Sequence, residues 1–202
     1  MRRGGKYCIA SVRTVRGCPK HCSCGSVWRT DGQKPRVRES DAVIEELVQL
    51  RRLGFRFIAL ADDNFYPVTT EDLRMAERRE DKTHLHELQA VRAERFALME
   101  QLARLPNDTV FFTQITMEAG EDPEFLDAMK RAHIKGALVG VESVTEAGLK
   151  SIYKNFNESG DSLGKALDAV HGRGGTGAGR GGVGAAERPG GRAGAPRARP
   201  DR

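Results

Sequence analysis

Short apolar runs alternate with helical patterns four times along the first 170 residues of this 202-residue chain. The apolar runs cover residues 7–14, 55–61, 109–116 and 137–141. The helical patterns cover residues 41–53 and about 70–105 with a break near 81–83, and further helices begin at Asp122-Pro123, after Thr145 and near Ser162. Repeated strand–helix units predict an α/β protein with a parallel sheet and crossover helices. The periodicity leaves open whether the sheet is open or part of a barrel.

The first predicted helix shows its signals most clearly. Ser40 is placed to cap it, and its apolar residues recur at intervals of three and four: Val43, Ile44, Leu47, Leu50 and Leu53. Gly54 is expected to end it, because glycine readily adopts the left-handed conformation that helix ends use. The run that follows, residues 55–61, is mostly apolar, as is typical of a strand buried on both faces.

Polar residues gather where the predicted strands end. A cysteine-rich loop follows the first strand, and the others end in Asp62-Asp63-Asn64, Gln114-Ile115-Thr116 and Glu142-Ser143. The carboxyl ends of parallel strands meet at one edge, where ligands of such folds bind. The sequence therefore predicts a functional site at that edge.

Residues 171–202 differ from the rest of the chain. They contain seven arginines, Glu187 and Asp201, and 11 of the 23 glycines, whereas residues 1–170 carry 26 basic and 26 acidic side chains. So few apolar residues cannot offset the entropy of ordering, and we expect a disordered tail. We hypothesise that this tail is read out of frame from GC-rich DNA, because Gly, Ala, Arg and Pro have GC-rich codons. A single confirmed reading frame would contradict the hypothesis.

The remaining composition indicates the setting of the protein. There is no apolar run of about 18 residues, so no membrane span is expected, and the charged N-terminus does not match a secretory signal. Three of the four cysteines lie within seven residues, a clustering more typical of metal binding or redox chemistry than of disulfides. We expect a reducing, cytoplasmic location.

The cysteine loop carries the strongest chemical signal. Cys18, Cys22 and Cys24 lie in a Gly- and Pro-containing segment directly after the first strand. Thiolates are soft ligands that suit zinc or an iron–sulfur cluster. A closed structural zinc site needs four ligands, whereas three thiolates leave one iron of a cluster open to a substrate or cofactor. Cys8 is interpreted as a small core residue.

Four stretches of the chain resemble the radical S-adenosylmethionine enzymes, in the branch whose core often follows a cobalamin-binding domain. These stretches are Arg13-Thr14-Val15-Arg16-Gly17-Cys18-Pro19, Ser26-Val27-Trp28-Arg29, Ala61-Asp62-Asp63-Asn64-Phe65 and Gly140-Val141-Glu142-Ser143. The resemblance implies a partial (β/α)6 TIM-like barrel, of which residues 1–170 would supply about four βα units and form an incomplete core domain.

The resemblance also implies a chemistry. Cys18, Cys22 and Cys24 would hold a 4Fe–4S cluster whose open iron binds S-adenosylmethionine. Reductive cleavage would then yield a 5′-deoxyadenosyl radical for hydrogen abstraction or methyl transfer. Asp62 or Asp63 would meet the amino group of S-adenosylmethionine, a suitable partner for a carboxylate. Glu142 and Ser143 would contact its other polar groups.

The implied partners are a small-molecule substrate, which the sequence does not specify, and an electron donor such as a flavodoxin or ferredoxin. Cobalamin is a cofactor of the parent branch.

The chain departs from the family pattern in two places. The family spacing Cys-x3-Cys-x2-Cys puts the third cysteine at residue 25, which is Gly25, while the nearby thiol is Cys24. The fifth and sixth strands of the family core are expected to be missing, because the Gly/Arg-rich tail stands in their place. Whether this chain is an active enzyme is therefore left open.

Two alternative functions remain at this point. Gly172-Arg173-Gly174-Gly175 and Gly179-Arg180-Gly181-Gly182 resemble RNA-binding segments, although no aromatic residue is interleaved for base stacking, so nucleic acid is the weaker partner. The loop cysteines with His21 could instead hold zinc. The charge-rich stretch from Arg74 to Arg95 is interpreted as a solvent-facing helix surface.

Overall fold

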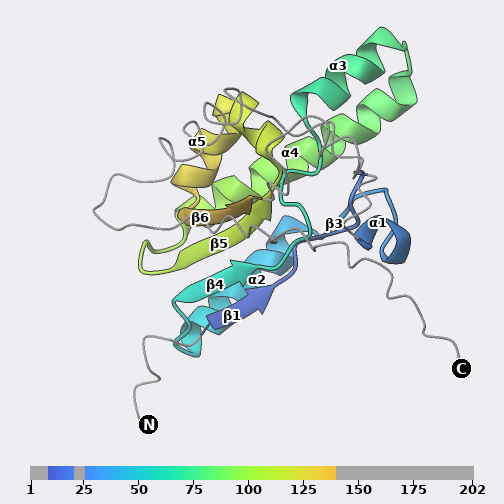
Figure 1. The fold of residues 1–202 in the computed structure, drawn as a ribbon. Coiled ribbons are helices and arrows are strands. Elements are labelled where there is room, and N and C mark those ends of the chain that lie inside the picture. Colours follow the sequence, from blue (N-terminus) through green and yellow to red (C-terminus); the bar gives the residue numbers. More distant parts are fainter. Residues whose placement is uncertain (1–8, 21–25, 140–202) are drawn as a thin grey trace, which may run out of the picture.

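The computed structural model describes residues 9–20 and 26–139 (Figure 1). Its elements, in chain order, are β1 (Ile9–Val12), β2 (Val15–Arg16), α1 (Val27–Thr30), β3 (Arg36–Val37), α2 (Ser40–Arg52), β4 (Phe57–Leu60), α3 (Thr70–Arg78), α4 (Lys82–Arg104), β5 (Val110–Ile115), the 3-10 helix η1 (Met117–Glu121), α5 (Pro123–Arg131) and β6 (Ile134–Val139). The helices expected after Thr145 and near Ser162, and the tail, lie outside the described residues.

Four strands form one parallel sheet in the order β1-β4-β5-β6. The spatial order follows the chain order, so each new strand adds beside the previous one. The predicted parallel α/β sheet is confirmed. A second sheet, which the sequence analysis did not predict, pairs β2 with β3 in antiparallel fashion.

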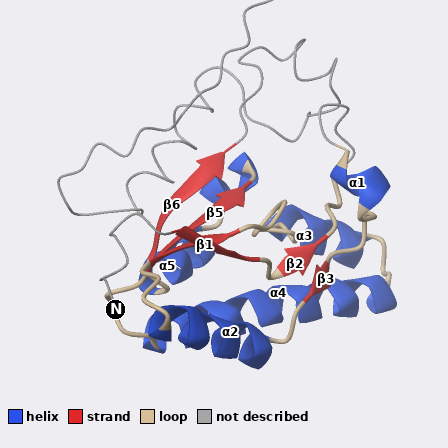
Figure 2. Ribbon diagram, turned by 90° about the horizontal axis from the view of Figure 1, so that it is seen from below, coloured by secondary structure: helices blue, strands red, loops and turns tan. Residues whose placement is uncertain are grey.

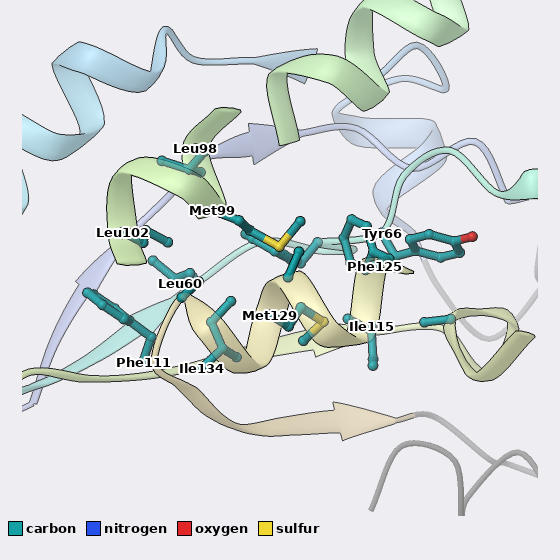
Figure 3. Close-up of a cluster of buried hydrophobic side chains, with 14 of the residues drawn as sticks. Leu60, Tyr66, Leu98, Met99, Leu102, Phe111, Ile115, Phe125, Met129 and Ile134 are labelled. Carbon is teal, nitrogen blue, oxygen red and sulfur yellow. The ribbon is translucent and has the colours of Figure 1, made fainter. Parts of the chain in front are cut away.

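The helices cover one face of the parallel sheet (Figure 2). Buried side chains of α2, α4 and α5 join those of all four strands in a single core cluster, part of which Figure 3 shows. Val43 and Leu47 contribute from α2, as their helical spacing predicts. Burying each such side chain stabilises the fold by roughly 1.5–3 kcal/mol.

The opposite face of the sheet is open among the described residues. Ile9 and Leu138 are 62% and 46% exposed, and Phe57 and Phe112 are also exposed. The prediction that residues 55–61 are buried on both faces was therefore wrong for Phe57. The ring of Phe112 lies over β6, where a Cβ atom on Gly136 would come within 2.9 Å of it. Gly136 thus makes room for an aromatic side chain on the open face.

Several helix boundaries follow local signals. Thr69 begins α3 with a capping box shared with Asp72, and Asp122 caps α5 ahead of Pro123. Gly54 ends α2 with φ +100°, as predicted. The predicted break in the long helical stretch separates α3 from α4, where Glu80 adopts φ 55°.

Two boundaries differ from expectation. Ser40 lies inside the first turn of α2, and the preceding Glu39 occupies the cap position without a side-chain cap. The fourth strand begins at Ile134 rather than at Ala137, because α5 ends at Arg131 and His133 reverses the chain with φ 60°.

None of the helices in the described part of the chain combines the length and apolar character required to cross a membrane.

Candidate cofactor site

The cysteine loop starts from a tightly fixed backbone. Gly17 adopts φ +89°, and a Cβ atom there would lie 2.8 Å from the carbonyl oxygen of Lys34 and 3.0 Å from that of Gly32. The amide of Cys18 donates to the Gly32 carbonyl at 3.1 Å. Glycine is required at position 17 both for its conformation and for this close approach. The half-buried Cys18 is therefore held against residues 32–34.

Asp62 connects the end of β4 to the end of β1. Its Oδ1 atom accepts hydrogen bonds from the amides of Thr14 (2.6 Å) and Val15 (2.9 Å). Its Oδ2 atom accepts a short hydrogen bond from the Thr14 hydroxyl. Burial raises the pKa of Asp62 above its usual value, and the hydrogen bonds from Thr14 and Val15 oppose that rise. Asp62 thus fixes the backbone from which the cysteine loop departs.

Arg95 supports this arrangement from α4. Its Nη1 atom donates to the Thr14 hydroxyl at 2.6 Å and lies 3.9 Å from Asp62 Oδ2. Its guanidinium also lies over the Phe65 ring, 5.4 Å from the centroid. Arg95 is only 1% exposed, and burial lowers its pKa. The three side chains form a buried hydrogen-bond network that runs from Arg95 through Thr14 to Asp62.

The next two residues after Asp62 have buried atoms without partners. Oδ2 of Asp63 and Nδ2 of Asn64 make no hydrogen bond in the described structure. The Asn64 side chain is oriented by its other atom, because Oδ1 accepts from the amide of Tyr66 at 3.0 Å. The adjacent Phe65 amide donates to the carbonyl of Gln114 at 2.8 Å, so this loop lies against the end of β5.

A second pair of buried polar groups follows β5. Oγ1 of Thr116 and Oε2 of Glu118 are both buried, and a hydrogen bond from Thr116 helps to lower the pKa of Glu118. The other Glu118 oxygen, Oε1, lies 2.8 Å from Nζ of Lys20, which is two residues beyond Cys18. Burial raises the pKa of Glu118, while Lys20 acts in the opposite direction. The ion pair joins the cysteine loop to the end of β5.

These residues meet at the carboxyl edge of the sheet, as the sequence predicted for such positions. A carboxylate oxygen of Asp63 and the amide nitrogen of Asn64 are buried there without partners in the described structure. Buried polar groups are nearly always hydrogen-bonded in folded proteins. The edge is therefore suited to a polar ligand that carries a positive group and hydrogen-bond acceptors.

The described residues include part of the predicted site. Cys18, Asp62 and Asp63 are brought to the same edge of the sheet, whereas Cys22, Cys24, Glu142 and Ser143 lie outside the described residues. Within the described ranges, no three His, Cys, Asp or Glu side chains are grouped so as to hold a metal ion. The cluster assignment and the roles of Glu142 and Ser143 stay predictions.

Sequence reasoning missed Arg95 as a site residue. The stretch from Arg74 to Arg95 was interpreted as a solvent-facing surface, which is wrong for Arg95. A signal was available, because Arg95 precedes Leu98 and Leu102 by three and seven residues, and all three lie on the core face of α4. Thr116 belongs to the polar groups that the sequence identified at strand ends, whereas Lys20 and Glu118 are too far apart in sequence for a local pattern to link them.

A separate cavity of about 430 Å³ lies between the α3–α4 hairpin and the segment 33–35. Its lining includes Pro19, Lys34, Met75 and Leu88, but not the unsatisfied atoms described above. It is therefore distinct from the strand-edge site.

Comparison with known proteins adds sequence and structural relatives. The chain matches no protein-family model. It is 27% identical over 165 residues to an uncharacterized methyltransferase from Synechocystis sp., covering 81% of this chain and 27% of that protein. It is also 27% identical over 153 residues to the hopanoid C-2 methylase of Rhodopseudomonas palustris, covering 75% of this chain and 25% of that protein. The chain thus spans about a quarter of the length of these relatives.

Solved structures share the fold. The radical S-adenosylmethionine methyltransferase TsrM from Kitasatospora setae, with tryptophan and a S-adenosylmethionine analogue bound, matches with a TM-score of 0.59 and 19% identity over 86% of this chain and 29% of its own. The predicted resemblance to radical S-adenosylmethionine enzymes is confirmed. The cobalamin-dependent S-adenosylmethionine radical enzyme OxsB has the same TM-score of 0.59, with 17% identity, and the match covers 79% of this chain and 22% of OxsB. TsrM has also been solved with cobalamin and a [4Fe-4S] cluster.

Proposed function

We propose that this chain is a radical S-adenosylmethionine iron–sulfur protein of the methyl-transferring kind. The observation that carries the proposal is the pair of unpartnered buried atoms on Asp63 and Asn64 at the strand edge, to which the cysteine loop is joined by the ion pair of Lys20 with Glu118. The methyltransferase relatives support methyl transfer over other radical reactions. The strand order also supports a partial (β/α)6 barrel, because the strands are added in chain order with no reversal.

The residues present fit the polar part of S-adenosylmethionine. Its ammonium group would pair with a carboxylate, and its hydroxyls and ring nitrogens would take up the amide and hydroxyl groups. We assign the ammonium to Asp63 rather than to Asp62, because the Asp62 oxygens already accept three hydrogen bonds from Thr14 and Val15. Asn64 would donate its free amide N–H.

A 4Fe–4S cluster held by Cys18, Cys22 and Cys24 would supply the one-electron reduction that cleaves the sulfonium bond of S-adenosylmethionine. The described residues serve that chemistry by position. Gly17 and the Lys20–Glu118 pair fix the cysteine loop on both sides of Cys18. Asp62, Thr14 and Arg95 fix the backbone before it.

The first test is reconstitution of the full chain with iron and sulfide under anaerobic conditions. Iron and labile sulfide should bind in about a 1:1 ratio, and a reductant with S-adenosylmethionine should release 5′-deoxyadenosine or transfer a methyl group. Cys18→Ser should abolish cluster binding, because it removes the thiolate. Zinc bound without sulfide would instead support the metal-binding alternative and contradict the proposal.

The second test is the affinity of the reconstituted chain for S-adenosylmethionine. Asp63→Asn keeps the shape of the side chain but removes its charge. Losing a charge-assisted hydrogen bond weakens binding by about 1.5–3 kcal/mol, or roughly 10–100-fold. Asp108→Asn is the matched control, since Asp108 is an exposed residue before β5 that pairs with Arg51 and Arg56 at the opposite strand ends. Equal affinities for the two variants would contradict the assignment of Asp63.

A further inference from the structure

The loop after β4 contains a buried tyrosine whose hydroxyl reaches the next strand–helix unit. Tyr66 is fully buried, and its hydroxyl donates to Oδ2 of Asp122 at 2.9 Å. Its ring packs edge-on against Phe125, with 4.6 Å between the ring centroids (Figure 3). Asp122 lies 56 residues further along the chain, at the start of α5. Tyr66 therefore ties the loop that presents Asp63 and Asn64 to a helix of the following unit.

The acceptor of this hydrogen bond is a buried carboxylate on which two helices converge. Oδ1 of Asp122 caps α5 by accepting from the amide of Phe125 at 3.1 Å, and Nη1 of Arg92 in α4 lies 2.7 Å from Oδ2. Burial acts to raise the pKa of Asp122, but its hydrogen bonds, that of Arg92 foremost, hold it below its usual value. Burial and the charge of Asp122 raise the pKa of Tyr66. At neutral pH the carboxylate is therefore an acceptor and the tyrosine hydroxyl a donor.

The same tyrosine orients Asn64. The backbone amide of Tyr66 donates to Oδ1 of Asn64 at 3.0 Å, and because a backbone N–H can only donate, it selects the oxygen of that side chain. The two polar atoms of an amide group lie in one plane, so fixing Oδ1 also fixes the direction of Nδ2. This nitrogen is buried without a partner among the described residues. On the other side, the amide of Thr70 donates to the Tyr66 hydroxyl at 3.3 Å, so the loop is held both before and after the tyrosine.

Packing alone does not require this hydroxyl. Phenylalanine would present the same ring to Phe125, and a buried hydroxyl costs free energy unless it is hydrogen-bonded. A buried polar network instead rigidifies the segments that it joins and specifies one arrangement of them. Tyr66, Asp122 and Arg92 form such a network, and one of the segments that it joins presents the unpartnered atoms at the strand edge. No atom of the network is one that we assign to S-adenosylmethionine.

We propose that Tyr66 is a positioning residue for the strand-edge site, which it serves by anchoring the loop to Asp122 and so holding Asn64 in place for the ligand. This inference rests on the proposed function. Tyr66 does not touch the ligand, because its hydroxyl is engaged by Asp122 and Thr70. It raises the affinity because a loop that is already ordered loses less conformational freedom when the ligand binds.

The link also has to act in the opposite direction. Coupling between two sites is reciprocal, so a ligand whose binding is strengthened by the Tyr66–Asp122 hydrogen bond strengthens that bond in turn. Asp122 caps α5, and the amide of Phe125 is the donor to that cap. Ligand binding at the strand edge should therefore slow hydrogen exchange at the start of α5, although we assign no atom of this helix to the ligand.

The test is a double-mutant cycle on the affinity of the full, reconstituted chain for S-adenosylmethionine, measured by titration calorimetry. Tyr66→Phe removes the hydroxyl alone, and Asn64→Ala removes the side chain through which it acts. We expect about fivefold weaker binding for Tyr66→Phe and about tenfold for Asn64→Ala. Adding Tyr66→Phe to Asn64→Ala should change the affinity by less than about twofold. Equal losses from Tyr66→Phe in the two backgrounds would show general loosening of the fold and overturn the proposal.

The control removes another buried hydroxyl. Thr109 is 1% exposed, and its hydroxyl bonds to Asp108 at the opposite ends of the strands. Thr109→Val should leave the affinity for S-adenosylmethionine unchanged. A loss equal to that of Tyr66→Phe would mean that any buried hydroxyl has this effect, which contradicts a specific role for the tyrosine.

Asp122→Asn tests the same link from its other end and replaces Tyr66→Phe in the cycle if that variant does not fold. Asparagine caps helices as well as aspartate does, so α5 keeps its cap. With its oxygen in the cap, its nitrogen cannot accept the Tyr66 hydroxyl. We therefore expect about fivefold weaker binding, and little further loss when Tyr66→Phe is added.

Hydrogen exchange followed by mass spectrometry gives a readout that needs no catalysis. S-adenosylmethionine should slow exchange at the start of α5 in the wild type and not in Tyr66→Phe. Unchanged exchange there in a wild type that binds the ligand would overturn the proposal and leave the proposed function intact. A wild type that binds no S-adenosylmethionine would refute the proposed function, and the role of Tyr66 with it.

Discussion

Replacing Arg95 with methionine should destabilise the fold and do so through Asp62. Methionine keeps the length and apolar stem of the side chain but removes its hydrogen bonds. Arg95 donates to the Thr14 hydroxyl at 2.6 Å and to the Thr14 carbonyl at 3.4 Å, and it is the cation nearest to the buried carboxylate of Asp62.

The magnitude follows from these contacts. A hydrogen bond to a charged group contributes about 1.5–3 kcal/mol, and removing one partner of a fully buried ion pair costs about 3–5 kcal/mol. Arg95 reaches Asp62 mainly through Thr14, at 3.9 Å directly, so we expect about 3 kcal/mol. With a urea m-value of about 2 kcal/mol/M, the unfolding midpoint would fall by about 1.5 M.

The assay is urea unfolding of the full chain, followed by circular dichroism, with two comparison variants. Arg104→Met makes the same substitution on the same helix, at an exposed residue whose ion-pair partner among the described residues is Glu100, and should cost less than about 0.5 kcal/mol. Adding Asp62→Asn to Arg95→Met removes the unpaired buried charge, so the double variant should recover about 1–2 kcal/mol.

The cost should also depend on pH. The pKa of Asp62 in the fold is raised above its usual 3.8, so the stability that this group contributes is full below that value and is lost as pH rises through the folded pKa. Arg95 opposes the rise, and its removal raises the pKa further. The cost of Arg95→Met should therefore be larger at pH 7 than at pH 4. An effect equal to that of Arg104→Met at both pH values would refute the reasoning.

Two further predictions concern the cysteine loop. Gly17→Ala should destabilise the chain by more than about 2 kcal/mol, because the added Cβ atom clashes with the Lys34 carbonyl and alanine also disfavours positive φ. Gly32→Ala is the control, because Gly32 has φ +84° but open space around it, and it should cost only about 1 kcal/mol. Thermal unfolding of both variants measures the difference. The second variant is Glu118→Gln, whose side chain cannot ionise. Burial raises the pKa of Glu118 above 4.5, so ionising this residue costs more in the folded than in the unfolded chain. The wild type should therefore lose stability relative to the variant as pH rises from about 4 to 7. A constant difference between the two proteins across that range, in unfolding measured at each pH, would contradict the second prediction.

Much of the fold could be predicted because its signals are local. The spacing of Val43 and Leu47, the cap and proline at Asp122-Pro123, and Gly54 each act within a few residues. The β2–β3 pair could not be predicted, because two-residue strands have no periodicity and form only when residues 15–16 and 36–37 meet.

The site was predictable in location but not in detail. The position of Asp62 and Asp63 at a strand end identified both as candidates. The sequence could not show which of the two carboxylates is available to a ligand. The structure separates them through long-range contacts: Asp62 accepts from Thr14, 48 residues away, while one Asp63 oxygen has no partner in the described part of the chain. Arg95 was misjudged because composition treats a charged residue as exposed, whereas its position on the core face of α4 decides its burial.

The addition of strands in chain order makes the stability of this domain approximately modular. Each parallel strand pairs only with its neighbours in the order β1-β4-β5-β6, and the helix between two strands packs on the same side. As in a linear array, the free energy of such a structure approaches a sum over adjacent interfaces. Losing or gaining a unit at the end of the series then acts mainly on the interface with its one neighbouring unit. The strand-edge site draws its described residues from the segments that follow β1, β4 and β5, so it depends on three consecutive units of the sheet.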